Sequence, residues 1–171
     1  MSDSSIHPDT RIGHVHLKVS DLERSVRFYT EVLGFELVTT YGDRAAFVSA
    51  GGYHHHIGLN TWESAGGTPP PPGTTGLYHF AILLPNRLEL ARTLRRLLEH
   101  RWPIEGASDH GVSEAVYLRD PDDNGIEIYA DRPRAVWPQT NGKIDMVTKP
   151  LDLRRLLADL QAAEATEASK S

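Results

Sequence analysis

A weak internal repeat limits the folds that this chain can adopt. The segment GHVHLKVSD, residues 13–21, can be laid over YHFAILLPN, residues 78–86, so that His14 aligns with His79 and apolar residues align with apolar ones. Each segment then runs into a helical pattern. A duplicated strand and helix predict two similar modules in one chain.

Each copy of the repeat carries start and stop signals for a helix. In the first copy a capping-box pattern begins at Ser20 and Gly34 is a stop signal, which predicts a helix over about residues 21–33. In the second copy Asn86 is a candidate N-cap, and the helix has to end before Pro103 because proline cannot continue it. Both copies therefore predict a strand followed by one helix.

Three strand-like segments follow each predicted helix, so the order is β-α-β-β-β in both copies. This pattern predicts an α+β fold of two paired βαβββ modules, the first over about residues 9–63 and the second over about residues 76–138. The predicted strands after the helices are residues 35–41, 45–49 and 54–60 in the first module, and a segment near Ile104, residues 115–119 and residues 125–130 in the second.

Two segments lie outside the modules. Residues 66–72, with two glycines and four consecutive prolines, cannot join a sheet and predict a connecting loop. After Pro150 leucines recur at helical spacing, which predicts an amphipathic helix that docks on the body of the chain or on a second subunit. We therefore divide the chain into a domain over residues 1–138 and a C-terminal helical extension over residues 139–171.

Composition narrows the partners of the protein. A net charge of −5 without a basic stripe argues against nucleic acid and favours a small-molecule substrate. No apolar run approaches the roughly 20 residues that span a bilayer, and the N-terminus lacks the apolar stretch of a signal peptide, so we expect a soluble, cytoplasmic protein. The chain has no cysteine but nine histidines. A metal would therefore be held by nitrogen and oxygen donors.

Two histidines of the repeat are candidate ligands. In a strand His14 and His16 share one face. Two histidines on a solvent-facing strand would not by themselves indicate a functional site. His79 lies in the nearly continuous apolar run of residues 77–84, which predicts burial. A buried imidazole is costly without a hydrogen-bond partner or a metal.

Glu127 is the sharpest single signal. It follows the turn sequence DDNG, residues 122–125, in the strand IEIYA, where a carboxylate calls for a cation or faces water at a sheet edge. Two histidines and one carboxylate form the facial triad of non-haem Fe(II) oxygenases. The spacing of three separated residues is not by itself a strong motif.

The opening segment GHVHLKVSDLERSVRFYTEVLGFEL and the closing segment YLRDPDDNGIEIYADRP resemble the vicinal-oxygen-chelate superfamily, which comprises glyoxalases, bleomycin-resistance proteins and extradiol dioxygenases. Together with GGYHHHIGLNTW and GLYHFAI, they are most similar to bacterial enzymes of the catechol-2,3-dioxygenase type. The similarity covers residues 9–138 or so. It implies that the sheets of the two modules curl into an open barrel around one metal ion.

The resemblance also implies a ligand set. Members of the superfamily take metal ligands from the first strand of each module and from the last strand of the second module. The residues at these positions here are His14, His79 and Glu127, and the resemblance implies Fe(II) or Mn(II) as the metal. Glyoxalases of the family often place a fourth, acidic ligand in the last strand of the first module. Gly58 stands there in this sequence, which we expect to leave room for substrate and oxygen and to disfavour glyoxalase chemistry.

Three further residues match catalytic positions of extradiol dioxygenases: His55, Tyr117 and His110. His55 would take up a substrate hydroxyl proton and later return it, Tyr117 would donate a hydrogen bond to the substrate, and His110 would orient the same groups. Simple strand alternation puts His56, and not His55, on the face of Gly58, so which of the two faces the metal stays open. The spacing from His110 to Tyr117 is shorter than in larger relatives.

The resemblance therefore implies an extradiol dioxygenase, an oxidoreductase of aromatic catabolism that inserts O2 into a catechol-like diol. One alternative is a metal-dependent isomerase, lyase or transferase on the same scaffold. Another is a protein of this fold that sequesters a small molecule without metal. The ring substituents of the substrate do not follow from the sequence, and the C-terminal helix leaves a homodimer open.

Overall fold

The computed structural model describes residues 5–170 and divides the chain into two compact units. The first unit runs to Thr30 and continues with Gly34–Thr68, and the second contains Glu31–Leu33 and the chain from Pro69 onward. Each unit is described by itself.

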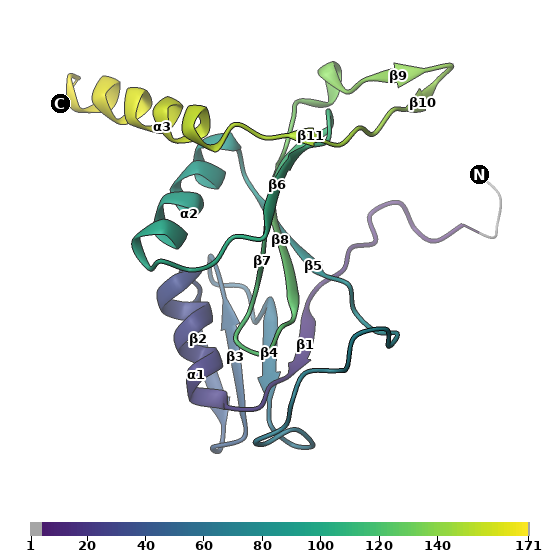
Figure 1. The fold of residues 1–171 in the computed structure, drawn as a ribbon, viewed down its shortest axis with the longest axis vertical. Coiled ribbons are helices and arrows are strands. Elements are labelled where there is room, and N and C mark those ends of the chain that lie inside the picture. Colours follow the sequence, from purple (N-terminus) through teal and green to yellow (C-terminus); the bar gives the residue numbers. More distant parts are fainter. Residues whose placement is uncertain (1–4, 171) are drawn as a thin grey trace. The chain divides into compact units, whose positions relative to one another are not determined.

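The first unit contains one sheet and one helix (Figure 1). The sheet has the strand order β1-β4-β3-β2, in which β1 runs parallel to β4 and the other neighbours are antiparallel. The elements are β1 (Val15–Lys18), α1 (Leu22–Arg27), β2 (Glu36–Tyr41), β3 (Ala45–Ser49) and β4 (Ile57–Asn60). Helix α1 continues as a π-helical turn (Phe28–Val32), whose last two residues belong to the second unit.

The N-cap of α1 is Asp21, one residue later than the capping box predicted. The Asp21 side chain accepts a hydrogen bond from the main-chain N–H of Arg24 at 2.9 Å, so the prediction of Ser20 as the cap was wrong. A carboxylate at this position is also stabilised by the positive end of the helix dipole. The predicted stop is in place, because Gly34 adopts a φ of 88° that favours glycine.

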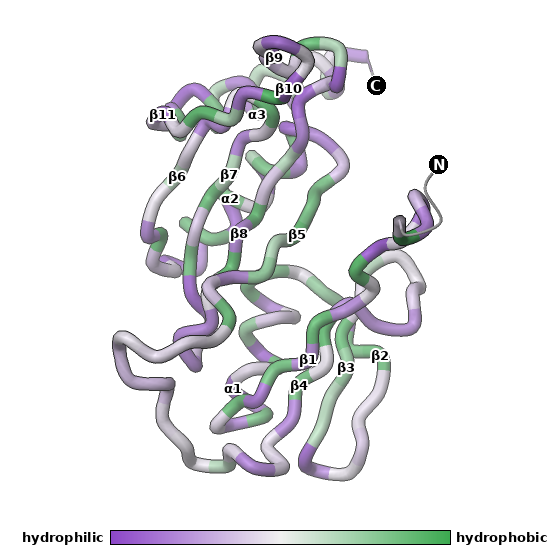
Figure 2. Tube along the Cα trace, turned by 90° about the vertical axis from the view of Figure 1, so that its right-hand side faces the viewer, coloured by the Kyte–Doolittle hydropathy of each residue, from purple (hydrophilic) through white to green (hydrophobic). Residues whose placement is uncertain are grey.

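The core of the first unit lies between α1 and the sheet. Strand β3 carries hydrophobic residues along most of its length (Figure 2), and both Ala46 and Val48 are fully buried. Tyr29 from the helical side and Leu59 from β4 are buried as well. Burial of these apolar side chains supplies the main driving force that holds α1 on the sheet.

The second unit repeats the order β-α-β-β-β and then adds an extension. Its sheet has the order β11-β6-β7-β8-β5, with β5 parallel to β8. Neither sheet closes on itself. The elements are β5 (Phe80–Leu84), α2 (Arg87–Glu99), β6 (Gly106–Asp109), β7 (Ser113–Arg119), β8 (Gly125–Asp131), a 3-10 turn (Arg134–Val136), β9 (Gln139–Thr140), β10 (Lys143–Ile144), β11 (Lys149–Pro150) and α3 (Leu153–Ala168).

The strand registers confirm the paired βαβββ modules. In the first unit Val15 pairs with Ile57, and in the second Phe80 pairs with Ile126. The repeat alignment that matched His14 with His79 therefore holds through the last strand of each module. It places Gly58 and Glu127 at equivalent positions.

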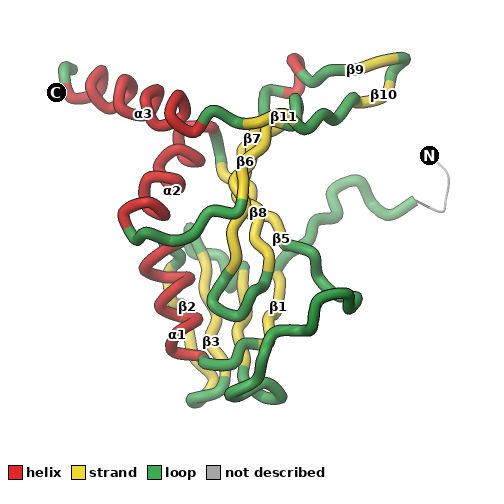
Figure 3. Tube along the Cα trace, viewed as in Figure 1, coloured by secondary structure: helices red, strands yellow, loops and turns green. Residues whose placement is uncertain are grey.

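The predicted C-terminal helix is confirmed, and it docks on its own chain. Helix α3 packs against α2, with Leu156 and Leu160 buried, and Arg95 makes two hydrogen bonds to Glu164 at 2.8 and 3.0 Å. Between the modules and α3, the extension forms a small hairpin of β9 and β10 and adds β11 to the sheet (Figure 3). No helix within residues 5–170 is long and apolar enough to cross a membrane.

Candidate active site

Two of the expected metal ligands meet in the second unit. His79 stands one residue before β5, and Glu127 is the third residue of β8, whose register partner in β5 is Ala81. Parallel pairing of these strands brings His79 Nε2 to 3.1 Å from Glu127 Oε2. Glu127 is largely buried, with 15% of its side chain exposed, and its carboxylate has a polar partner in the His79 imidazole. His79 is half-buried, and it has the partner that its apolar surroundings require.

Gly125 makes this meeting possible. A Cβ atom at position 125 would lie 2.2 Å from the main-chain oxygen of Tyr78 and 3.1 Å from the Cβ of His79. No side chain fits at the first of these distances, because real Cβ contacts are well beyond 3 Å. The glycine that closes the DDNG turn therefore also lets the start of β5 lie against β8 beside Glu127.

Tyr117 lies directly opposite Glu127 in the antiparallel pair of β7 and β8. Its hydroxyl oxygen is 3.1 Å from Glu127 Oε1. Burial, together with the neighbouring Glu127 carboxylate, raises the pKa of Tyr117 to about 12. Tyr117 is therefore a neutral hydroxyl near pH 7 and can donate one hydrogen.

His110 completes a chain of polar groups that leads away from Glu127. Its Nε2 lies 2.7 Å from the Tyr117 hydroxyl, and its Nδ1 lies 2.9 Å from the main-chain oxygen of Val147. The structure thus brings His79, Glu127, Tyr117 and His110 together. The contact to Val147 was missed by sequence reasoning, because the segment before α3 carries no motif that places it near His110.

Three of these side chains line one cavity of the second unit. Its volume is about 520 Å³, within the range of pockets that hold small organic ligands. His79, Tyr117 and His110 contribute to its wall, and Thr148 of the extension closes part of it. The remaining lining residues are Tyr78, Glu105, Gly106, Ser108, Leu118, Arg119, Gly125 and Ile126.

The other two expected residues lie together in the first unit. His14 stands one residue before β1, as His79 stands before β5, and its ring centroid is 4.4 Å from that of His55. Burial, followed by the nearby imidazoles of His14 and His54, lowers the pKa of His55. A neutral imidazole of this kind is able to accept a proton.

The structure distinguishes the three consecutive histidines. His55 lies beside His14, whereas His56 contacts Ser49 Oγ through its Nδ1 at 2.9 Å. His54 Nδ1 is 2.8 Å from His55 Nδ1. Strand alternation failed to place them because all three residues precede β4, which begins at Ile57.

The space expected beside Gly58 is occupied. A Cβ atom at position 58 would lie 2.9 Å from Cγ of His16, whose residue is the register partner of Gly58. The expectation that the missing acid leaves room for substrate and oxygen was therefore wrong at this point, because the His16 ring fills the room. An acidic side chain at position 58 would displace that ring.

The donor set suits Fe(II) or Mn(II), but it is divided between the units. Within residues 5–170 no three histidine, aspartate or glutamate side chains are grouped to hold a metal, and His14 belongs to the first unit. The pair in the second unit fits one metal. Two donors about 2.1 Å from one ion and at right angles lie about 3 Å apart, and His79 Nε2 and Glu127 Oε2 are separated by 3.1 Å.

The chain resembles known proteins over most of its length. Residues 11–128 match the model of the Glyoxalase/Bleomycin resistance protein/Dioxygenase superfamily. The chain is 48% identical over 157 residues to the catechol-2,3-dioxygenase of Bacillus subtilis. The aligned stretch covers 91% of this chain and 54% of that protein. It is 31% identical to biphenyl-2,3-diol 1,2-dioxygenase 3 of Rhodococcus globerulus, over 71% of this chain and 63% of that protein.

The chain thus spans 54% and 63% of the lengths of these two relatives. Among solved structures, the lactoylglutathione lyase of Agrobacterium tumefaciens is similar with a TM-score of 0.56 and 25% identity. That similarity covers 72% of this chain and 96% of the lyase.

Proposed function

Because the chain belongs to the glyoxalase/bleomycin resistance protein/dioxygenase superfamily, we propose that it is an extradiol dioxygenase that opens a catechol-like ring with O2. The observation that supports this proposal most is the contiguous row of His79, Glu127, Tyr117 and His110, in which His79, Tyr117 and His110 line one cavity. Two of its relatives are dioxygenases that act, by their names, on aromatic diols.

We propose His14, His79 and Glu127 as the ligands of one Fe(II) or Mn(II) ion. Two neutral imidazoles and one carboxylate would leave a divalent ion with one net positive charge and with positions for other ligands. When bound, the metal would supply a positive charge that favours ionisation of the diol and a redox centre through which electrons pass from the ring to O2.

His55 would act as the general base of the reaction. Its lowered pKa keeps the ring neutral near pH 7, so a nitrogen lone pair is available to take a hydroxyl proton from the substrate. His54, whose Nδ1 faces that of His55, is exposed to solvent and would hold the ring in orientation. The proton would later return from His55 to the product.

Tyr117 and His110 would orient the substrate oxygen. A tyrosine with a pKa of about 12 keeps its hydrogen throughout the reaction, so it acts as a hydrogen-bonding group and not as a base. Its position between Glu127 and His110 ties its hydroxyl to the wall of the cavity. Preorganisation of this kind stabilises charge that develops on a bound oxygen.

An isomerase or lyase on the same scaffold is the second candidate, since a lactoylglutathione lyase shares the fold. The surroundings of position 58 argue against an isomerase or lyase. A fourth acidic ligand would have to stand where Gly58 lies under the His16 ring. A protein that only sequesters its ligand would not need Glu127 paired with His79 of the cavity wall.

Oxygen labelling tests the proposal. The Fe(II)-loaded protein is mixed with catechol under 18O2, and the product is examined by mass spectrometry. A ring-opened product that carries two labelled oxygen atoms supports a dioxygenase. Tight metal binding without oxygen uptake across a panel of substituted catechols would contradict it and favour an isomerase or lyase.

A further inference from the structure

The segment that follows the modules takes part in the wall of the cavity. Residues 138–150, which we name the C-terminal strap, lie beyond the stretch that matches the family model. Lys149 pairs with Asp109 where β11 joins β6, and the main-chain N–H of Val147 donates to the main-chain oxygen of His110 at 3.1 Å. The strap is therefore bound to the strand end that carries His110.

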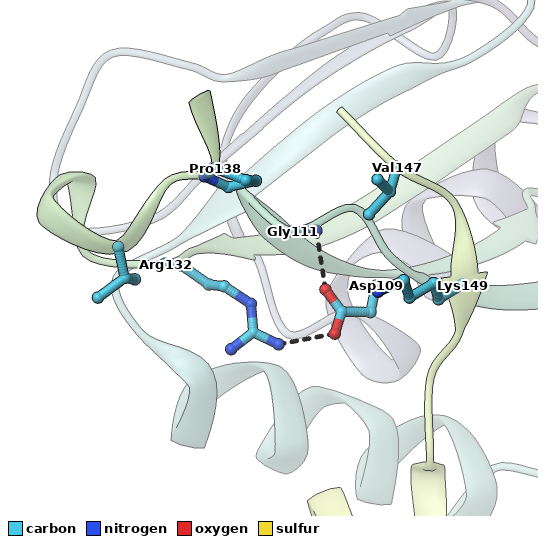
Figure 4. Close-up of a pocket in the computed structure, with 7 residues that line it drawn as sticks. Asp109, Gly111, Arg132, Pro138, Val147 and Lys149 are labelled. Atoms are coloured by element: carbon cyan, nitrogen blue, oxygen red, sulfur yellow. Dashed lines mark hydrogen bonds and ion pairs between the residues drawn. The ribbon is translucent and has the colours of Figure 1, made fainter. Parts of the chain in front are cut away.

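Gly111 lets the strap approach this closely. Its φ is 76°, and a Cβ atom at this position would lie 3.1 Å from Cγ of Pro138 and 3.3 Å from Cγ2 of Val147. Figure 4 shows Gly111 between the side chains of these two strap residues. A hydrogen bond from the Gly111 N–H to Asp109 Oδ1 at 2.8 Å fixes the turn from the other side.

The contact between the strap and His110 determines where the imidazole carries its hydrogen. A main-chain oxygen can only accept, so at 2.9 Å from the oxygen of Val147 the Nδ1 of His110 has to donate. In the neutral ring the lone pair is then on Nε2, which lies 2.7 Å from the Tyr117 hydroxyl. Because Nδ1 keeps its hydrogen, His110 can exchange a proton only at Nε2, on the side of Tyr117.

We propose that Val147 is a positioning residue of the site, whose main-chain oxygen holds His110 in the Nδ1–H tautomer. The neutral ring then presents the lone pair of Nε2 to the Tyr117 hydroxyl, whose one hydrogen has two possible acceptors, His110 Nε2 and the Glu127 Oε1 to which it donates at 3.1 Å. The strap thereby sets which hydrogen bonds Tyr117 can offer a substrate.

The proposal depends on the proposed function only for its catalytic meaning, because the tautomer of His110 can be measured without turnover. Protein labelled with 15N in its histidines is examined by long-range proton–nitrogen NMR above pH 8, and His110→Gln identifies the signal. His100, exposed at the end of α2, serves as the reference for an averaged tautomer. A hydrogen fixed on Nδ1 of His110 supports the proposal, and a hydrogen on Nε2 or a pattern like that of His100 overturns it.

Two glycine variants separate the role of the strap from backbone strain. Gly111→Ala meets Pro138 and Val147, whereas Gly142→Ala has a φ of 75° but no atom within 4 Å of the new Cβ. We expect Gly111→Ala to shift the His110 signals toward the averaged pattern and Gly142→Ala to leave them unchanged. Unchanged His110 signals in a folded Gly111→Ala would contradict the role of the strap, and if this variant does not fold the wild-type tautomer decides.

The same pair reports on catalysis. In the metal-loaded protein we expect Gly111→Ala to lower kcat roughly tenfold relative to Gly142→Ala, since small displacements of positioning groups weaken catalysis. Metal content should be equal in both variants. Should neither protein turn over any catechol, the proposed function fails while the NMR result still tests the position of His110.

Discussion

The imidazole of His16 lies over Gly58, at the point where a side chain at position 58 would begin. The two residues are register partners in the parallel pair of β1 and β4, and a Cβ at Gly58 would be 2.9 Å from the ring. In the second unit the equivalent partners are Ala81 and Glu127. The repeat thus combines a small residue with a large one in both units, but in opposite strands.

This relationship predicts coupling between the two positions. Gly58→Ala should lower the free energy of unfolding by about 1–3 kcal/mol, because the new Cβ collides with the His16 ring. His16→Ala in the same chain should restore most of that loss. Urea unfolding of the two single variants and the double variant measures the coupling, and additive effects would show that the ring does not occupy this space.

We predict different effects for substitutions of the neighbouring residues His55 and His56 in the first unit. His55→Gln should lower kcat by about 10²–10⁴-fold with metal content unchanged, as expected on loss of a general base. His56→Gln should lower stability by about 1–3 kcal/mol through the lost contact to Ser49, and its kcat should stay close to the wild-type value. Steady-state kinetics and metal analysis of both variants check this, and a larger kcat loss in His56→Gln would reverse the assignment.

We predict that Asp109 makes the stability of the folded protein depend on pH. Burial acts to raise the pKa of its carboxyl, but the Gly111 N–H and the Arg132 guanidinium outweigh burial, so the pKa lies below its ordinary value of 3.8. The unfolded state therefore binds more protons in this window, and the stabilisation is present above pH 3.8 and lost as the pH falls through the lowered value.

Asp109→Asn tests this by removing the titrating group while keeping an oxygen for the Gly111 N–H. Its free energy of unfolding should fall less steeply than that of the wild type as the pH drops below about 4. Asp43→Asn, in the exposed turn between β2 and β3, is the control and should retain the wild-type slope. Equal slopes for all three proteins would contradict the contribution of Asp109.

The sequence carried enough information to predict the modules. Hydrophobic periodicity, the Asn86 cap and the Gly34 stop located both helices, and the repeat alignment gave the correct register of Gly58 and Glu127. These features are local, so one sequence reveals them. The Asp21 cap was missed because Ser20 and Asp21 are both good caps and the choice depends on backbone geometry.

The details of the site depend on contacts between distant residues. Nothing in the sequence around Val147 indicates that its main-chain oxygen meets His110, since any residue supplies that atom. The two-residue strands of the strap are likewise too short to produce a pattern. The triple histidine misled strand alternation because it lies before β4 and not within it.

The role of Glu127 is tested by the reaction of the Fe(II)-loaded protein with catechol and air, compared with Glu127→Gln and with the exposed control Glu23→Gln. We predict a yellow ring-opened product that requires Fe(II), forms with Glu23→Gln, and is lost with Glu127→Gln together with bound iron. Product formation by Glu127→Gln at the wild-type rate, or by metal-free protein, would contradict the assignment of Glu127 and the account built on it.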